Sequence, residues 1–171
     1  MKAIDASPRA SSHLKTLQSV GYTLNTAISD IIDNSITAKA TEINIFFDTQ
    51  NVVLKIEDNG IGMSKSELQE NMIIGCKDPF DKRERRDLGR FGSGMKMASF
   101  SQAHKLSVIT RRHNSDISGI FYDVDEIYKT NKWVMHELEK EELTDTEFDQ
   151  NYKSGTLVIW NNLVKFKDRD A

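Results

Sequence analysis

The residues best suited to chemistry form the run from Asp58 to Met63, with the sequence Asp-Asn-Gly-Ile-Gly-Met. The carboxylate follows a β-rich stretch, and glycines at alternate positions let a backbone approach a ligand closely or adopt positive φ angles. An ionised carboxylate only accepts hydrogen bonds, so it suits an exocyclic amine such as that of adenine. Taken alone, however, the run is better explained as a strand that ends in a tight turn.

A second glycine-rich segment extends from Gly89 to Lys96, with the sequence Gly-Arg-Phe-Gly-Ser-Gly-Met-Lys. It opens a predicted helix, whose free N–H groups and dipole are suited to phosphate, and Lys96 adds a cation. The spacing is not that of a Walker loop, and no βαβ unit precedes it as in a dinucleotide fingerprint. A glycine-rich helix entry without a ligand explains the segment equally well.

Asp30 and Asn34 lie four residues apart in another predicted helix and therefore project from one side of it. A carboxylate one turn from a carboxamide could supply a general base and an oxygen ligand for Mg²⁺. The alternative is a solvated helix face, which the apolar neighbours Ile31, Ile32 and Ile36 make a poorer explanation.

Thr156 follows Gly155 at the start of the last predicted strand. An inward-pointing hydroxyl there could reach a purine ring through water. Considered alone, the pair is better explained by a β-branched residue that begins a strand.

The elements that must position these residues follow from the spacing of apolar residues, capping patterns and turn residues. Helices are predicted at residues 12–20, from about 23, at 65–74 and at 92–102, and strands at 42–47, 52–58, 105–110, 118–124, 133–139 and 156–161. Helices and strands do not alternate regularly, which excludes a doubly wound parallel fold. We predict an α+β two-layer sandwich, with a mixed, mostly antiparallel sheet and helices on one face.

The composition sets outer limits on the protein. A chain of 171 residues fits one domain, and a net charge of −3 gives no general attraction to nucleic acid or anionic membranes. The single cysteine, Cys76, excludes an intramolecular disulfide framework. No apolar run is long enough to span a membrane, and the N-terminus lacks the apolar core of a signal peptide. We therefore expect a cytoplasmic protein that does not bind membranes.

Together and in this order, the four motifs resemble those of the GHKL superfamily (gyrase, heat-shock chaperone, histidine kinase and MutL), whose ATP site is called the Bergerat fold. The resemblance covers residues from about 24 to 163. The second glycine segment and the later Gly-Thr-Leu-Val-Ile-Trp-Asn-Asn-Leu are similar to MORC-type ATPases and their bacterial relatives. The Gly-x-Gly-Leu-Gly-Leu segment and phosphoacceptor helix that accompany histidine kinases do not occur in this sequence.

The resemblance implies a role for each motif. Asp58 would hold adenine with support from Thr156, and Asn34 would coordinate the Mg²⁺ that bridges the phosphates of ATP. Asp30 would take the position of the water-activating carboxylate, which is usually Glu in hydrolytic relatives, so hydrolysis would be slow. The base pocket would be shaped by Gly60, Gly62 and Met63, and the phosphates would be met by Gly92, Ser93, Gly94, Met95 and Lys96.

The resemblance also implies a conformational switch. The charged, irregular loop at residues 75–89 would close over the triphosphate, although its balanced charge equally fits a solvated loop. ATP would promote dimerisation of a longer protein, of which residues 1–171 are one N-terminal ATP-binding domain. A downstream transducer domain would supply a phosphate-contacting lysine, and nucleic acid would be bound only through the rest of the protein. The alternatives are a nucleotide-binding module without catalysis and, less well matched, a histidine-kinase catalytic domain.

Overall fold

A computed structural model describes residues 8–19, 21–75, 94–144, 146, 148 and 152–164. In chain order the elements are α1 (Ala10–Gln18), α2 (Leu24–Thr37), β1 (Ile43–Asp48), β2 (Val53–Asp58), α3 (Lys65–Met72), α4 (Gly94–Gln102), β3 (Ala103–Arg111), β4 (Ser118–Asp123), α5 (Val124–Thr130), β5 (His136–Glu137), α6 (Lys140–Thr144) and β6 (Gly155–Leu163). The strands form one six-stranded sheet in the order β1-β2-β6-β3-β4-β5.

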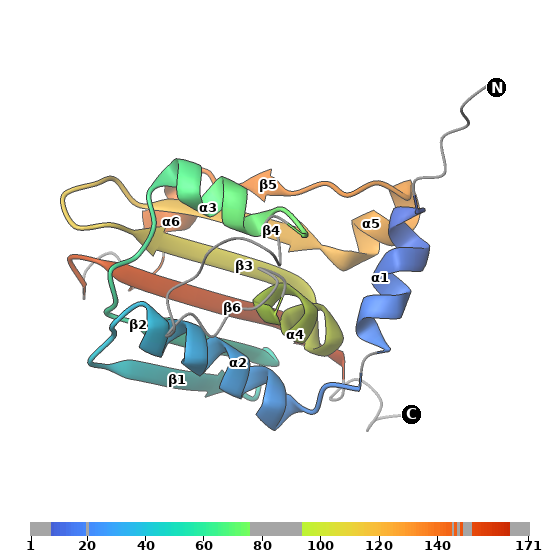
Figure 1. Cartoon of the computed structure of the whole chain (residues 1–171), viewed down its shortest axis with the longest axis horizontal. Coiled ribbons are helices and arrows are strands. Elements are labelled where there is room, and N and C mark those ends of the chain that lie inside the picture. The colour runs from blue at the N-terminus through green and yellow to red at the C-terminus, as the bar shows by residue number, and fades with distance from the viewer. Residues whose placement is uncertain are drawn as a thin grey trace, which may run out of the picture.

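The predicted α+β sandwich is confirmed. Helices α1, α2, α3 and α4 cover one face of the sheet (Figure 1). Every strand pairing in the described part of the chain is antiparallel, so the sheet contains no parallel pair there. The last strand in the sequence, β6, lies between β2 and β3 in the middle of the sheet.

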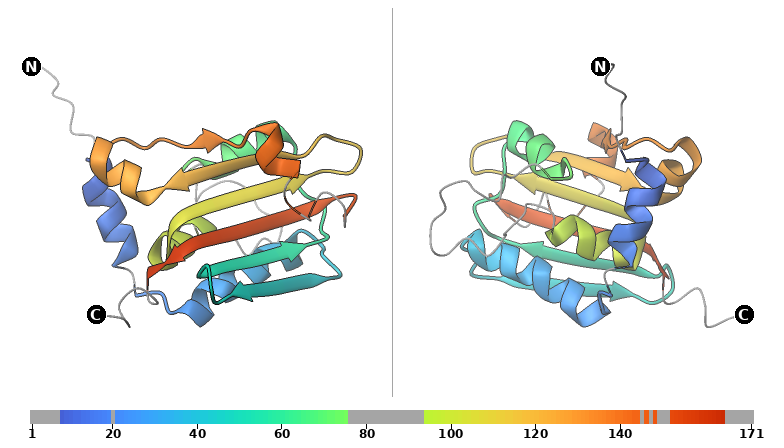
Figure 2. Two further views of the ribbon diagram at one scale, coloured as in Figure 1. Left: turned by 180° about the vertical axis from the view of Figure 1, so that it is seen from behind. Right: turned by 45° about the vertical axis from the view of Figure 1, so that its right-hand side comes forward.

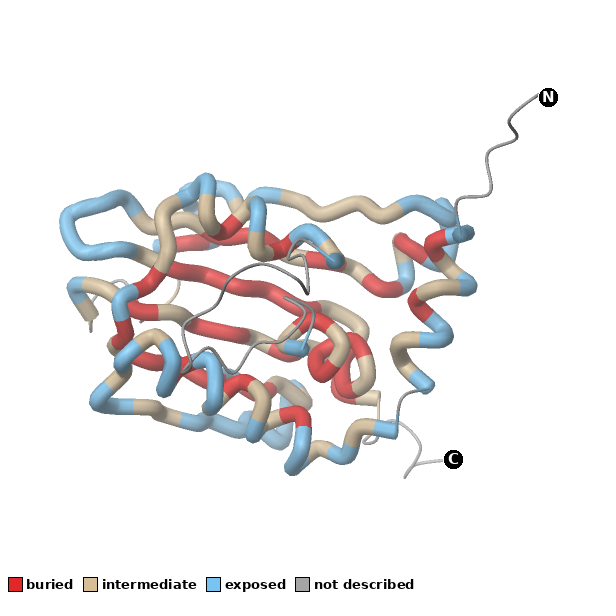
Figure 3. Tube along the Cα trace, viewed as in Figure 1, coloured by how far each residue is buried: buried red, intermediate tan, exposed pale blue. Residues whose placement is uncertain are grey.

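The strand register arranges the helix-covered face in rows that cross β2, β6, β3 and β4. Two neighbouring rows are buried and almost wholly apolar: Leu54, Trp160, Leu106 and Tyr122, then Ile56, Val158, Val108 and Ile120. The next row, at the end of the sheet, consists of polar residues, and we call it the polar row: Asp58, Thr156, Thr110 and Ser118. Figure 3 shows the buried strands beneath the helices. The polar row thus ends an apolar core.

Local sequence signals account for the helices that border this row. Thr23 caps α2 and forms a capping box with Thr26. Ser64 and Glu67 form the predicted capping box of α3. Both boxes satisfy N–H groups that a helix start would otherwise leave unpaired.

The region after β4 differs from the prediction. The predicted strand at residues 133–139 is reduced to the two residues of β5, and α5 follows β4 without a break. Strand β4 ends at Asp123 because the side chain of this residue accepts hydrogen bonds from the backbone N–H groups of Asp125 and Glu126, and so caps α5.

A small second core lies on the opposite face of the sheet, where α6 packs (Figure 2, left). Its buried members are Ile109, Leu143, Phe148 and Leu157. The chain therefore buries apolar side chains on both faces of the central strands, although the larger helices lie on one. In the described part of the chain, no helix is both long enough and apolar enough to cross a membrane.

Candidate nucleotide-binding site

Asp58 is the acidic end of the polar row. Its side chain is buried, with the residue 6% exposed. Oδ2 accepts a hydrogen bond of 2.9 Å from the Ser35 hydroxyl of α2, and Oδ1 accepts one of 2.8 Å from the backbone N–H of Gly60. Burial raises the pKa of Asp58, while the hydrogen bonds from Gly60, Ser35 and the backbone of Thr156 act in the opposite direction. A carboxylate is therefore held in a fixed orientation at the end of a buried strand.

The glycines after Asp58 let the turn pack against other parts of the backbone. A Cβ on Gly60 would lie 2.8 Å from the carbonyl oxygen of Ala38, at the end of α2. Gly62 has a φ of +62°, and a Cβ there would lie 2.0 Å from the carbonyl oxygen of Arg111 and 2.8 Å from that of Gly155. Neither position has room for a side chain, so the turn is fastened to α2, β3 and β6. The contacts of these glycines with a ligand remain a prediction.

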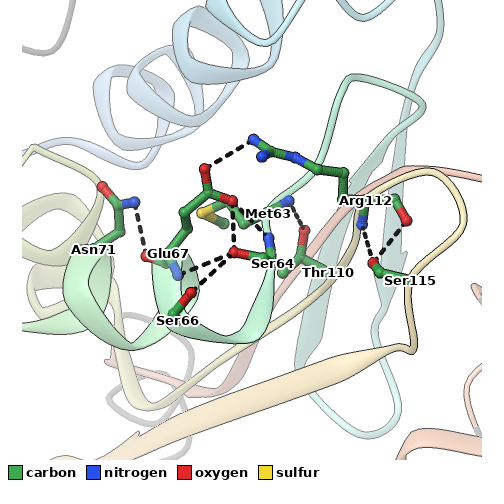
Figure 4. Close-up of polar contacts among 8 residues, drawn as sticks. All are labelled: Met63, Ser64, Ser66, Glu67, Asn71, Thr110, Arg112 and Ser115. Carbon is green, nitrogen blue, oxygen red and sulfur yellow. Dashed lines mark hydrogen bonds and ion pairs between the residues drawn. The ribbon is translucent and has the colours of Figure 1, made fainter.

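Thr110 joins the turn to the two central strands. Its hydroxyl donates to the carbonyl of Gly155 at 2.7 Å and lies 3.1 Å from the hydroxyl of Thr156. The backbone N–H of Met63 donates to the same oxygen at 3.0 Å, as Figure 4 shows. The prediction from sequence missed Thr110, because a threonine inside a β-rich stretch gives no local sign of such a role.

A second set of contacts fixes the start of α3 beside the turn (Figure 4). Glu67 accepts hydrogen bonds from the backbone N–H and the hydroxyl of Ser64, both at 2.8 Å. Its other carboxylate oxygen lies 2.9 Å from the guanidinium of Arg112, just after β3. The Ser64 hydrogen bonds are the main reason that the pKa of Glu67 is lowered. The segment after Met63 is thereby tied to the β3–β4 hairpin.

Asp30 lies on α2 at the other end of the site. Its Oδ2 accepts a hydrogen bond of 2.7 Å from the hydroxyl of Tyr22. A Cβ on Gly94 would lie 3.7 Å from the same oxygen, so the carboxylate faces the first residue of α4. Burial, followed by the hydrogen bond to Asp30 and its charge, raises the pKa of Tyr22 to about 12. The hydroxyl consequently stays protonated and orients Asp30, a contact that the sequence did not reveal.

Asn34 follows Asp30 by one turn of α2 and is exposed. No group in the described part of the chain hydrogen-bonds to its side-chain amide. No three His, Cys, Asp or Glu residues among those described lie close enough to hold a metal ion by themselves. The side-chain oxygen of Asn34 suits Mg²⁺, which commonly takes one or two protein ligands and completes its shell with phosphate and water.

Lys96 is almost completely buried, at 1% exposed. Its ammonium group donates to the backbone carbonyl of Asn71 in the last turn of α3. The next carbonyl, that of Met72, accepts a hydrogen bond of 2.8 Å from the Tyr122 hydroxyl. Lys96 therefore helps to close the end of a helix, where carbonyls lack intrahelical partners. Its predicted contact with phosphate remains a prediction.

Of the other residues predicted to contact phosphate, two are described by the structure and two are not. Gly94 begins α4 and is exposed, and Met95 is half-buried against the main core. Gly92 and Ser93 lie outside the described residues, as do residues 76–91 with most of the predicted loop.

Comparison with known proteins shows the family of the chain. A family described as "Histidine kinase-, DNA gyrase B-, and HSP90-like ATPase" matches residues 22–156. The chaperone protein HtpG of Bacillus licheniformis is 34% identical over 96 residues, which is 50% of this chain and 15% of that protein. HtpG of Helicobacter pylori is 34% identical over 84 residues, and HtpG of Natranaerobius thermophilus is 33% identical over 98. These matches cover 43% and 50% of this chain, but only 13% and 16% of the relatives.

Proposed function

Since the chain belongs to the family of histidine kinase-, DNA gyrase B- and HSP90-like ATPases, we propose that it binds ATP with Mg²⁺ and hydrolyses it slowly. The observation that carries the proposal is the position of Asp58, a buried carboxylate fixed by Ser35 and Gly60 where the polar row ends an apolar core. The narrower likeness to MORC-type ATPases stays a prediction.

In the proposed complex, adenine lies against the polar row. Asp58 accepts a hydrogen bond from the exocyclic amine, and Thr156, its direct cross-strand partner, supports the ring. The base would insert beside the turn at Gly60, Gly62 and Met63. Apolar surface for stacking is supplied by the core that the polar row terminates.

The phosphates extend along α2 toward the start of α4. Asp30 and Asn34 project from α2 one turn apart, and Asp30 faces Gly94. The free N–H groups at the start of α4 suit negatively charged oxygens. Mg²⁺ would neutralise charge on the phosphates, with Asn34 as its protein ligand. Every residue named here is carried either by α2 or by α4, which pack against each other in the main core.

For hydrolysis, Asp30 would accept a proton from the water that attacks the γ-phosphate. The Tyr22 hydroxyl holds one carboxylate oxygen, which leaves the other for the water. Asp is one methylene shorter than the Glu expected at this position, and a misplacement of about 1 Å can reduce a rate about 100-fold. A nucleotide-binding module without significant catalysis is therefore the second candidate function.

Asp30→Asn is expected to separate these two functions. Loss of the base should reduce single-turnover phosphate release by about 100-fold, while the dissociation constant for ATP changes little. Calorimetry with ATP and ADP gives the affinities, and Tyr22→Phe is the matched control, since it removes the orienting hydrogen bond but keeps the carboxylate. Equal phosphate release by wild type and Asp30→Asn would show that Asp30 is not the base. Binding without release above the solvent rate in wild type would favour the second candidate.

Ser35→Ala is expected to move the pH dependence of ATP binding. Ionised Asp58 accepts the amine more strongly than the protonated acid, which gains an O–H donor and keeps only weaker acceptor capacity. Affinity should therefore fall as the pH decreases through the pKa of Asp58, which burial places above its usual value. Ser35 stabilises the ionised form, and its removal should raise that pKa further. The midpoint of the affinity loss, measured by calorimetry between about pH 4.5 and about pH 8, should therefore lie at higher pH in the variant. The titration of ATP itself is common to both proteins, and identical midpoints would contradict the assignment.

We extend the proposal, on the strength of the superfamily resemblance, to nucleotide-dependent closure of residues 75–89 and dimerisation of a longer protein. Sedimentation of that protein with and without a non-hydrolysable ATP analogue tests the second part. A mass that is the same in both conditions would contradict dimerisation while leaving ATP binding intact.

A further inference from the structure

The hydrogen bonds of Thr110 determine the direction of a neighbouring hydroxyl. A threonine hydroxyl has one hydrogen to donate and two lone pairs to accept with. The carbonyl of Gly155 can only accept, so it takes the hydrogen of Thr110. The N–H of Met63 can only donate, so it occupies one lone pair. The third partner, the Thr156 hydroxyl at 3.1 Å, must then donate to the remaining lone pair.

This direction decides what Thr156 presents to a ligand. Its hydrogen is committed to Thr110, which is fully buried. The lone pairs of Thr156 are therefore what it offers to a ligand or a bound water. Asp58 is its direct partner across β2 and β6, so the two side chains leave the same face of the sheet about 5 Å apart. The ionised carboxylate also only accepts hydrogen bonds, so two acceptors stand side by side in the polar row.

We propose that Thr110 is a positioning residue that sets base specificity, by holding the Thr156 hydroxyl as an acceptor beside Asp58. The inference rests on the proposed binding of ATP and deepens it. A pair of acceptors matches the exocyclic amine of adenine, directly or through water. It opposes a purine that carries a carbonyl at the same position, because that oxygen is also an acceptor. Selection against such bases then depends on a residue that does not itself touch the nucleotide.

The test compares ATP with inosine triphosphate, in which a carbonyl replaces the amine and the neighbouring ring nitrogen is protonated. Thr110→Val keeps the shape of the side chain but releases the Thr156 hydroxyl to rotate and donate. The ratio of the affinity for ATP to that for inosine triphosphate should fall by about 10-fold, as the loss of one oriented hydrogen bond would give. Thr110→Ser restores the hydroxyl and should restore the ratio. Calorimetry measures both affinities in each protein.

Ser118→Ala is the matched control, since Ser118 is the neighbour of Thr110 in the polar row on the side away from Thr156. It should leave the ratio unchanged. A folded Thr110→Val protein with the wild-type ratio would overturn the inference and leave the proposed function standing. If Thr110→Val does not fold, Thr156→Val removes the same acceptor, and an unchanged ratio there also overturns it. Failure of wild type to bind either nucleotide would overturn both proposals.

Discussion

Asp58→Asn should weaken ATP binding by about 100-fold or more. The substitution replaces a charged acceptor by a carboxamide of nearly the same shape. If the amide nitrogen of the new side chain takes the place of Oδ2, its N–H group faces the exocyclic amine of adenine. Both groups are hydrogen-bond donors, so one buried N–H is left without an acceptor. Removing one half of a buried, charged hydrogen bond costs about 3 kcal/mol, which corresponds to this loss of affinity.

The same substitution should leave the fold intact, which makes the result interpretable. The carboxamide oxygen can still accept from the N–H of Gly60. The Ser35 hydroxyl already lies 3.2 Å from the carbonyl of Ile31, so it can donate there and accept from the new amide. Urea denaturation and calorimetry should therefore show near wild-type stability together with lost ATP binding. Retained affinity in a folded Asp58→Asn protein would remove Asp58 from the site.

Gly62→Ala should give the largest loss of stability, about 4 kcal/mol or more in the free energy of unfolding. The new Cβ would lie 2.0 Å from the carbonyl oxygen of Arg111. That carbonyl cannot easily withdraw, because Arg111 pairs with Gly155 at the end of the two central strands and Thr110 holds the carbonyl of Gly155. Either the turn leaves β3 or the two strands separate, and both would disturb Asp58.

Gly75→Ala is the matched control for this prediction. Gly75 has a φ of +72°, close to that of Gly62, but a Cβ there would meet no atom of the described residues within 4 Å. It should cost only the conformational penalty of a left-handed alanine, about 1–2 kcal/mol. The difference between the two variants in urea denaturation isolates the backbone contact. Equal losses would mean that the contact between the turn and β3 contributes no stability.

Features that depend on neighbours in sequence could be predicted. The capping box of Ser64 and Glu67 is local, and so is the spacing of Asp30 and Asn34 on α2. The position of Asp58 at the end of a strand follows from the pattern of β2 and its turn. Each of these needs only the periodicity of one element and its capping residues.

Features that depend on register between distant strands could not be predicted. Thr110 and Thr156 meet because β3 and β6 pair in one register, and nothing within either strand fixes it. The contact of Tyr22 with Asp30 crosses the start of a helix, and that of Ser35 with Asp58 joins a helix to a strand. Lys96 was expected in the phosphate site from its charge, its place in the glycine-rich segment and the superfamily resemblance, whereas its burial under the end of α3 depends on tertiary packing.

The central position of β6 has a consequence for how the chain is made. Residues up to the end of α6 leave the ribosome before β6 does, so β2 and β3 at first have no strand between them. Until Gly155 and the residues after it emerge, each of these strands presents an unpaired edge, which is where non-native pairing and aggregation begin. Asp58 and Thr156 become neighbours only at that last step. The site is therefore completed only when β6 pairs with β2 and β3. A nascent chain that ends before Gly155 contains Asp58 but lacks Thr156.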